Sequence, residues 1–249
     1  MSYRPTRGGG AGADLMQAAP LTVVLIAINV AVYALQARSS SIIATMDSGT
    51  TGGSQAVQGS VDSDFGLWGP MVSSGEWWRL ITSGFLHASL LHIGSNMLAL
   101  FFIGRALEPA LGSLRLAVIY FVSLAAGSLG VIIVEPNALS IGASGAIFGL
   151  RGAFVIFARS RGISVMQSGI GPVILLNLAI TFTIPGISIG GHLGGLAGGA
   201  AIMAIVVELD RNRRFRGDNR RIVVGVGAAA FVVLLVAAFA LARSKYPLA

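Results

Sequence analysis

Seven long apolar runs constrain this chain more than any other feature of its sequence. They are Leu21–Gln36, Leu90–Ala106, Leu114–Val134, Ala143–Ala158, Ile170–Ile184, Ile189–Val207 and Ile222–Leu241. A helix needs about 20 predominantly apolar residues to cross about 30 Å of hydrocarbon, and only helices and closed barrels satisfy their backbone polar groups inside lipid. The runs therefore predict an all-α polytopic membrane protein with seven transmembrane helices.

Composition excludes the other fold classes. Hydrophobic residues make up 54% of the 249 residues, and only 11% are charged, against about 25% in soluble domains. So few charged side chains cannot cover a surface that faces water, which excludes soluble, disordered, collagenous and coiled-coil chains. The absence of cysteine excludes disulfides and thiolate chemistry.

The segments between the runs predict how the chain is divided. Residues Met1–Ala19 lack an apolar core, so they read as a tail and not as a signal peptide. Arg38–Asp64 is rich in Ser, Thr and Gly and reads as a loop, whereas the tryptophans of Phe65–Trp78 are typical of a membrane interface. The expected parts are a cytoplasmic tail (1–19), a six-helix core (20–208) with an external loop (38–78), a basic cytoplasmic loop (209–221), a seventh helix (222–242) and an external tail (243–249).

The positions of the basic residues predict the orientation. With the N-terminus inside, twelve Lys and Arg side chains face the cytoplasm and four face the outside, which agrees with the positive-inside rule. The twelve are Arg4, Arg7, Arg105, Arg115, Arg159, Arg161, Arg211, Arg213, Arg214, Arg216, Arg220 and Arg221, and the four are Arg38, Arg79, Arg243 and Lys245. This asymmetry accounts for the net charge of +7 without nucleic acid, although a lipid-headgroup or partner patch at 211–221 is an alternative. We expect a multi-pass protein of a bacterial plasma membrane.

Five strongly polar side chains lie inside the runs, where they are costly and are functional candidates. His92 and Asn96 are four residues apart and share one helix face, while Ser144, His192 and Arg151 lie in the fourth and sixth runs. Each has a structural alternative: Ser144 as an N-cap, Asn96 as an interhelical hydrogen bonder and each histidine as a bundle-facing donor. Arg151 has no assigned role beyond extending toward the cytoplasm.

Ser144 and His192 supply a nucleophile and a base. A serine is a weak nucleophile until an adjacent base takes its proton. Gly191, Gly195 and Gly199 recur every four residues, a spacing that lets two helices approach closely. The serine and histidine helices can then bring these side chains within about 3 Å.

Three donors could stabilise an oxyanion. His92 and Asn96 carry side-chain N–H groups on one helix face, and the Ser144 amide lies at a helix N-terminus. A zinc site is the chemical alternative, but His87 and His92 are five residues apart and therefore about 140° apart on a helix. No His-Glu-x-x-His pattern exists, so we expect neither metal nor cofactor.

Taken together, these residues resemble the rhomboid family of intramembrane serine proteases. The resemblance covers about Leu21–Val207, with Ile222–Leu241 as an additional C-terminal helix. In the order of the family, its motifs are Trp78-Arg79, His87, His92-x-x-x-Asn96, Glu108, Gly142-x-Ser144-Gly145 and His192-x-x-Gly195-x-x-x-Gly199.

The resemblance implies a role for each matched position. Ser144 is expected to be the nucleophile and His192 the base, with His92, Asn96 and the Ser144 backbone N–H as the oxyanion hole. Phe148 occupies the place of an aromatic ring that stacks on the base, while Arg151 stands where an apolar residue is expected. The remaining positions are supporting: Gly142 lining the cavity, Gly145, Gly195 and Gly199 beside the site, and Trp78 and Arg79 in a structural loop.

The expected function is cleavage of transmembrane segments of other membrane proteins near their outer ends, through an acyl-enzyme. Two alternatives stay open. One is a catalytically inactive rhomboid-like protein that binds membrane clients, a class that loses the serine or the histidine. The other is a small transporter, whose repeated halves with broken helices are not seen in the sequence.

The predicted topology can be tested with reporters. A reporter that is active only outside the cytoplasm, fused after Ala249, is expected to be active, because the basic residues place the C-terminus outside. A cytoplasm-only reporter at the same position is expected to be silent. Labelling of the loop at Asn219 by a membrane-impermeant reagent applied from outside would contradict the orientation.

Overall fold

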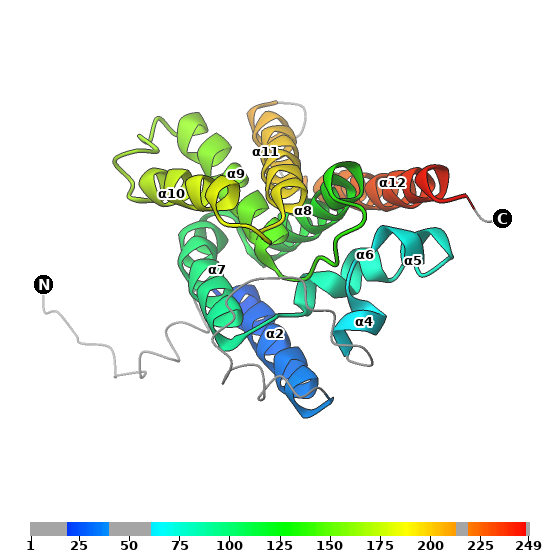
Figure 1. The fold of residues 1–249 in the computed structure, drawn as a ribbon. Helices are drawn as coiled ribbons and strands as arrows, with labels where there is room; N and C mark the ends of the chain where they lie inside the picture. Colours follow the sequence, from blue (N-terminus) through cyan, green and yellow to red (C-terminus); the bar gives the residue numbers. More distant parts are fainter. Residues whose placement is uncertain (1–18, 40–60, 213–218, 248–249) are drawn as a thin grey trace, which may run out of the picture.

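The fold is a bundle of helices, and its structure, a computed structural model, describes residues 19–39, 61–212 and 219–247. Within these residues, seven helices have 14 residues or more, and each coincides with one of the apolar runs. They are α2 (Pro20–Ser39), α7 (Leu90–Leu111), α8 (Ser113–Val134), α9 (Ser144–Ser160), α10 (Ile170–Thr183), α11 (Ile189–Arg211) and α12 (Arg220–Lys245). The described residues contain no strand, only an isolated bridge between Leu67 and Ser140, so the all-α prediction is confirmed (Figure 1).

Five of these helices are long and apolar enough to cross a membrane: α2, α7, α8, α11 and α12. The other two are shorter, with 17 residues in α9 and 14 in α10, against about 20 for a full crossing. The polytopic architecture is therefore confirmed, while seven complete crossings, the orientation and the division of the chain into core, loops and tails stay predictions. Residues 1–18, 40–60 and 213–218, which belong to the predicted N-terminal tail, external loop and basic loop, lie outside the described residues.

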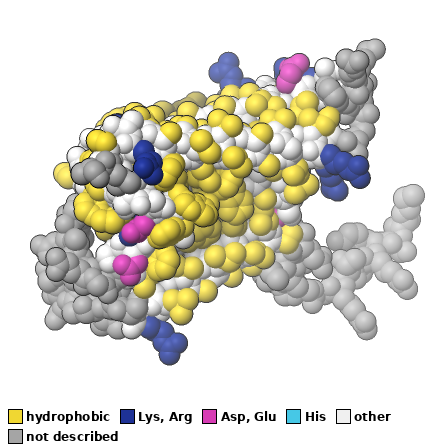
Figure 2. All heavy atoms as spheres, turned by 90° about the vertical axis from the view of Figure 1, so that its right-hand side faces the viewer, with side chains coloured by type: hydrophobic (Ala, Val, Ile, Leu, Met, Phe, Trp, Pro, Cys, Tyr) yellow, Lys and Arg dark blue, Asp and Glu magenta, His cyan; other side chains and the backbone are white. Residues whose placement is uncertain are grey.

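The outer surface of the bundle is apolar. Leu91 is 75% exposed, and Phe102 and Val233 are each 64% exposed. Figure 2 shows one face that is largely hydrophobic, with charged side chains toward its edges. Exposed apolar surface on this scale marks a lipid or protein interface, as expected of helices that contact the bilayer.

α7 continues five residues beyond the predicted end at Ala106. The reason is Glu108, which a hydropathy pattern places outside the membrane but whose carboxylate is buried against the start of α2. Its oxygens accept from the backbone N–H of Leu21 at 2.7 Å and of Thr22 at 2.9 Å, and from the hydroxyl of Ser113 at 2.6 Å. A carboxylate that satisfies the first N–H groups of a helix stabilises that N-terminus, so Glu108 joins α7 to α2.

Four short helices follow α2, in and after the segment predicted as a loop and an interfacial piece: α4 (Val61–Phe65), α5 (Gly69–Ser73), α6 (Arg79–Thr82) and the 3-10 helix η2 (Ser83–Phe85). Arg79 holds them together from a buried position. Its guanidinium donates to the carbonyls of Ser63 at 2.6 Å and Gly66 at 2.8 Å and pairs with Glu76. Trp77 is 55% exposed, which agrees with the predicted interfacial position.

α12 packs on α8, on the side of the bundle away from α10 (Figure 1). At its end, the ammonium of Lys245 donates to the carbonyls of Ile132 and Ile133 at 2.8 and 2.9 Å. These carbonyls belong to the last turn of α8, where a cation satisfies acceptors that lack helical partners. Ser73 of α5 also donates to the Tyr246 carbonyl, so the seventh helix contacts both α8 and the short helices.

α11 packs against α8 and α9 through backbone contacts at glycine. A Cβ atom on Gly199 would lie 2.0 Å from the Gly149 carbonyl oxygen of α9, and one on Gly190 would lie 2.3 Å from the Gly130 oxygen of α8. The stripe predicted from the four-residue spacing is therefore one of two: Gly195 and Gly199 contact α9, while Gly190 and its neighbour Gly194 contact α8. Two glycine faces on one helix place α11 between α8 and α9.

Substitution of the interface glycine tests this packing. Gly199→Ala is expected to destabilise the protein by about 1–3 kcal/mol, because the added methyl overlaps a backbone oxygen that cannot rotate away. Gly225→Ala in α12 is the matched control, since nothing lies within 4 Å of its Cβ position. Thermal unfolding in detergent should show a lower midpoint for Gly199→Ala and an unchanged or higher one for Gly225→Ala; equal midpoints would show that the contact is not tight.

Candidate active site

Ser144 is the first residue of α9, and its hydroxyl does not cap the helix. The N-cap position belongs to Ala143, and no side-chain capping bond is made there. The structure thus differs from the N-cap alternative, because the chain enters the helix one residue earlier than that alternative requires. A hydroxyl at this position, half-buried at a helix start, is available for chemistry.

Gly142 brings His92 and Ser144 to the same point. Its φ of +129° lies in a region that L side chains rarely adopt. A Cβ atom at Gly142 would lie 2.9 Å from the Nε2 atom of His92 and 3.7 Å from the Ser144 hydroxyl oxygen. Only a residue without a side chain leaves room for both groups there.

His92 lies in the first turn of α7, which Ser89 caps by accepting from the His92 backbone N–H at 3.1 Å. The backbone N–H of Ala88 donates to Nδ1 of the His92 ring at 3.3 Å. A neutral imidazole whose Nδ1 accepts a hydrogen bond carries its proton on Nε2. His92 therefore presents an N–H donor on the side of Gly142 and Ser144. Asn96, one turn further on the same face, is buried.

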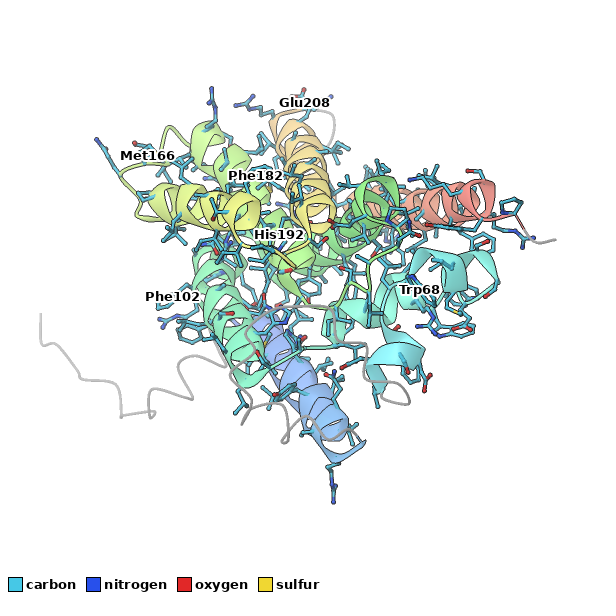
Figure 3. All side chains as sticks on the ribbon, viewed as in Figure 1. Trp68, Phe102, Met166, Phe182, His192 and Glu208 are labelled. Atoms are coloured by element: carbon cyan, nitrogen blue, oxygen red, sulfur yellow. The ribbon has the colours of Figure 1, made fainter. Side chains whose placement is uncertain are left out.

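His192 is buried near the start of α11 and lies at the centre of the bundle in Figure 3. Ser188 caps this helix by accepting from the Gly191 backbone N–H at 2.9 Å and donates to Glu135 at the end of α8. The His192 ring stacks on Phe148 of α9, with centroids 4.1 Å apart and planes at 20°. Phe148 is one turn after Ser144, so α9 carries the hydroxyl and the ring on one face.

The backbones of the serine and histidine helices touch beside these two residues. A Cβ on Gly145 would lie 3.1 Å from the Gly191 carbonyl oxygen, and one on Gly195 would lie 2.0 Å from the Gly145 oxygen. The neighbours of Ser144 and His192 in sequence are thus in van der Waals contact. This places the two candidate residues at the same end of the α9–α11 interface.

A small cavity opens beside Ser144. Its volume is about 40 Å³, and its lining includes the hydroxyl-bearing residues Ser83, Ser128, Ser140, Ser144 and Ser188. At roughly 10–15 Å³ for each molecule, this volume holds about three or four waters. The cavity supplies a place for water next to the candidate nucleophile.

Arg151 is buried, whereas the sequence suggested a side chain that extends out of the membrane toward the cytoplasm. It is 6% exposed, and its guanidinium carbon lies 4.8 Å from the centroid of the Phe148 ring. A cation over an aromatic face gains about 2 kcal/mol or more when it is desolvated. This contact within one helix face holds the side chain inside the bundle.

Thr181 of α10 is a site residue that sequence reasoning missed. Its hydroxyl oxygen lies 2.7 Å from Nδ1 of His192. The signal available in the sequence was weak, because a threonine in an apolar run is common and its partner is 11 residues away on another helix.

The remaining predicted residues lie around this centre. Trp78 and Arg79 are not in the cavity but in the adjoining short helices, which the bridge between Leu67 and Ser140 ties to the segment before Ser144. The His87 ring lies 5.1 Å from that of His92. Among the described residues there is no group of three or more His, Cys, Asp or Glu that could hold a metal ion.

Comparison with known proteins identifies the family of this chain. A family profile described as "Rhomboid domain" matches residues 74–209, which is more than half of the 249 residues. Rhomboid protease GluP of Bacillus subtilis is 39% identical over 132 residues, which make up 52% of this chain and 26% of GluP. YdcA of the same bacterium is 36% identical over 146 residues, or 57% of this chain and 73% of YdcA.

A plant relative differs in activity. Inactive RHOMBOID-like protein 8 of Arabidopsis thaliana is 38% identical over 117 residues, or 47% of this chain and 32% of that protein. The matched region is thus about a quarter of GluP and a third of the plant protein. The profile match includes both helices that carry Ser144 and His192 as well as the start of α7, and this multi-pass membrane protein belongs to the rhomboid family.

Proposed function

We propose that this chain is a serine endopeptidase that cleaves peptide bonds within the membrane. The observation that carries the proposal is the arrangement of two residues on α9. Ser144 does not cap the helix and lies beside His92, and Phe148, one turn later, stacks on the His192 ring. The names of the relatives do not decide the activity, because both proteases and an inactive protein are among them.

The proposed reaction is acyl transfer through a dyad. The Ser144 hydroxyl attacks the scissile carbonyl carbon while a ring nitrogen of His192 takes its proton. Collapse of the tetrahedral intermediate breaks the C–N bond, and His192 returns the proton to the leaving amine. A water molecule, deprotonated in turn by His192, then hydrolyses the ester and releases Ser144. Every step uses groups of this chain and water.

Three donors would stabilise the negative oxygen of the intermediate. The contact with Ala88 supports His92 as a donor through Nε2, beside Ser144. The Asn96 amide and the Ser144 backbone N–H, one of the first N–H groups of α9 that lack a helical acceptor, complete the proposed oxyanion hole. Donors fixed before the reaction are worth more than mobile ones, because they need no reorganisation as charge develops.

The proposed substrates are transmembrane segments of membrane proteins. The apolar outer surface supports an approach through the bilayer, and a cavity of about 40 Å³ supports small side chains at the cleavage site. A helical peptide bond cannot present its carbonyl to Ser144, so we expect substrates with helix-weakening residues near the bond that is cut. We also propose that the protein lies in a bacterial plasma membrane with its N-terminus in the cytoplasm.

Fluorophosphonate labelling of the full chain in detergent tests the activity. An activated serine displaces fluoride from the probe and forms a covalent adduct, which is expected for the wild-type protein and not for Ser144→Ala. Absence of the adduct in a folded wild-type protein would overturn the proposed protease function and favour the catalytically inactive alternative. An inactive protein is among the relatives.

Variants of the two histidines test the division of roles. His192→Ala is expected to abolish both cleavage and labelling, because Ser144 is then never deprotonated. His92→Ala and Asn96→Ala should each lower the cleavage rate by up to about 10²–10³, the scale for one oxyanion donor. The control is Ser95→Ala on the exposed side of α7, where the hydroxyl only donates to the His92 carbonyl. Labelling that survives in His192→Ala and fails in His92→Ala would reverse the assignment.

A further inference from the structure

Thr181 stands apart from the rest of its helix. Half of the 14 residues of α10 are exposed, and its buried residues are Gly171, Ile174 and Thr181. Thr181 is 2% exposed, and its hydroxyl oxygen lies 2.7 Å from Nδ1 of His192 and 2.7 Å from the carbonyl oxygen of Asn177. The hydroxyl has one proton, so it can donate to only one of these two neighbours.

Counting protons assigns the direction of both bonds. A carbonyl oxygen can only accept, so the short contact with Asn177 is a hydrogen bond only if Thr181 donates to it. If Thr181 donated to Nδ1 instead, two oxygen acceptors would face each other at 2.7 Å. The hydroxyl therefore accepts from Nδ1–H of His192. In a neutral imidazole this leaves Nε2 without a proton and able to act as a base.

Stacking on Phe148 does not determine which of its two orientations the His192 ring adopts. A ring held face to face with another can still turn by 180° about its Cβ–Cγ bond and stay stacked, since this torsion is broad and nearly two-fold. The turn exchanges the positions of the carbon and nitrogen atoms of the imidazole. A hydrogen bond at Nδ1 distinguishes the two orientations, and in the described residues that bond comes from Thr181.

We propose that Thr181 is a positioning residue that holds His192 in the Nδ1–H tautomer, with Nε2 as the base toward Ser144. The proposal rests on the proposed protease function for its kinetic consequence, but the tautomer itself does not. The two histidines of the site are then held in opposite tautomers: Ala88 N–H donates to Nδ1 of His92, whereas Nδ1–H of His192 donates to Thr181. One ring offers a donor at Nε2 and the other an acceptor.

Three variants of α10 test the kinetic role with the full chain in detergent micelles. Thr181→Val keeps the shape of the side chain and removes the acceptor. Thr181→Ser keeps the hydroxyl. Thr183→Val is the matched control, because Thr183 is exposed and donates to the Ala179 carbonyl in the same way that Thr181 donates to Asn177.

The expected result is a split between kcat and KM. Thr181→Val should lower kcat about 10- to 100-fold, less than the roughly 10⁴-fold loss when a charged partner that fixes a catalytic tautomer is replaced. KM should change by less than about twofold, because the hydroxyl touches the base and not the substrate. Thr181→Ser and Thr183→Val should keep near-wild-type kcat. An unchanged kcat in a folded Thr181→Val protein would overturn the proposal.

A spectroscopic measurement gives a second readout that needs no activity. With ¹⁵N-labelled histidine in the Ser144→Ala background, the two ring nitrogens of His192, identified by comparison with His192→Ala, should report a proton on Nδ1. Addition of Thr181→Val should shift the signal toward Nε2–H or a mixture. A proton on Nε2 while Thr181 is intact would overturn the proposal, even if the valine variant does not fold. If the wild-type protein is not labelled by the fluorophosphonate but His192 has the expected tautomer, only the proposed protease function would be overturned.

Discussion

The contact of α11 with α8 and α9 through bare backbone is the constraint on which the site depends. Glycine on both faces of α11 lets carbonyl oxygens of its neighbours occupy the space where Cβ atoms would otherwise lie. Helices usually pack 8–10 Å apart because side chains separate them, whereas glycine contacts allow a closer approach. Ser144 and His192 both lie beside such contacts, so the packing that takes the place of a hydrophobic driving force in lipid also brings these two residues to the same end of the α9–α11 interface.

Close packing of the helices alone does not determine the orientation of the polar side chains. Each ring of the site instead has a neighbour that limits it: Ala88 at Nδ1 of His92, Thr181 at Nδ1 of His192, and Phe148 under the His192 plane. In an apolar interior an unpaired polar group is costly, so such contacts are favoured and the alternatives are suppressed. The arrangement favours one donor and one acceptor nitrogen in each ring, which in the proposed protease would be set before a substrate binds.

The sequence predicted the helices well, because apolar length is the dominant requirement inside lipid and each run is read independently of the others. It failed at the end of α7, since the role of Glu108 depends on the start of α2, 86 residues away. The candidate residues were found because serine, histidine and asparagine are rare inside apolar runs. Thr181 was missed because threonine is common in apolar runs, so the sequence does not single it out. Only its contact with His192 in the structure indicates a role.

Arg151 shows how a buried cation can be accommodated locally. Ser144, Phe148 and Arg151 are spaced by four and then three residues, so they lie along one face of α9. The hydroxyl comes first, the ring beneath His192 follows one turn later, and the guanidinium follows over that same ring. Both contacts use the aromatic π-system, which phenylalanine supplies. The arginine lies two turns along α9 from the serine, where it contacts the ring that stacks on His192.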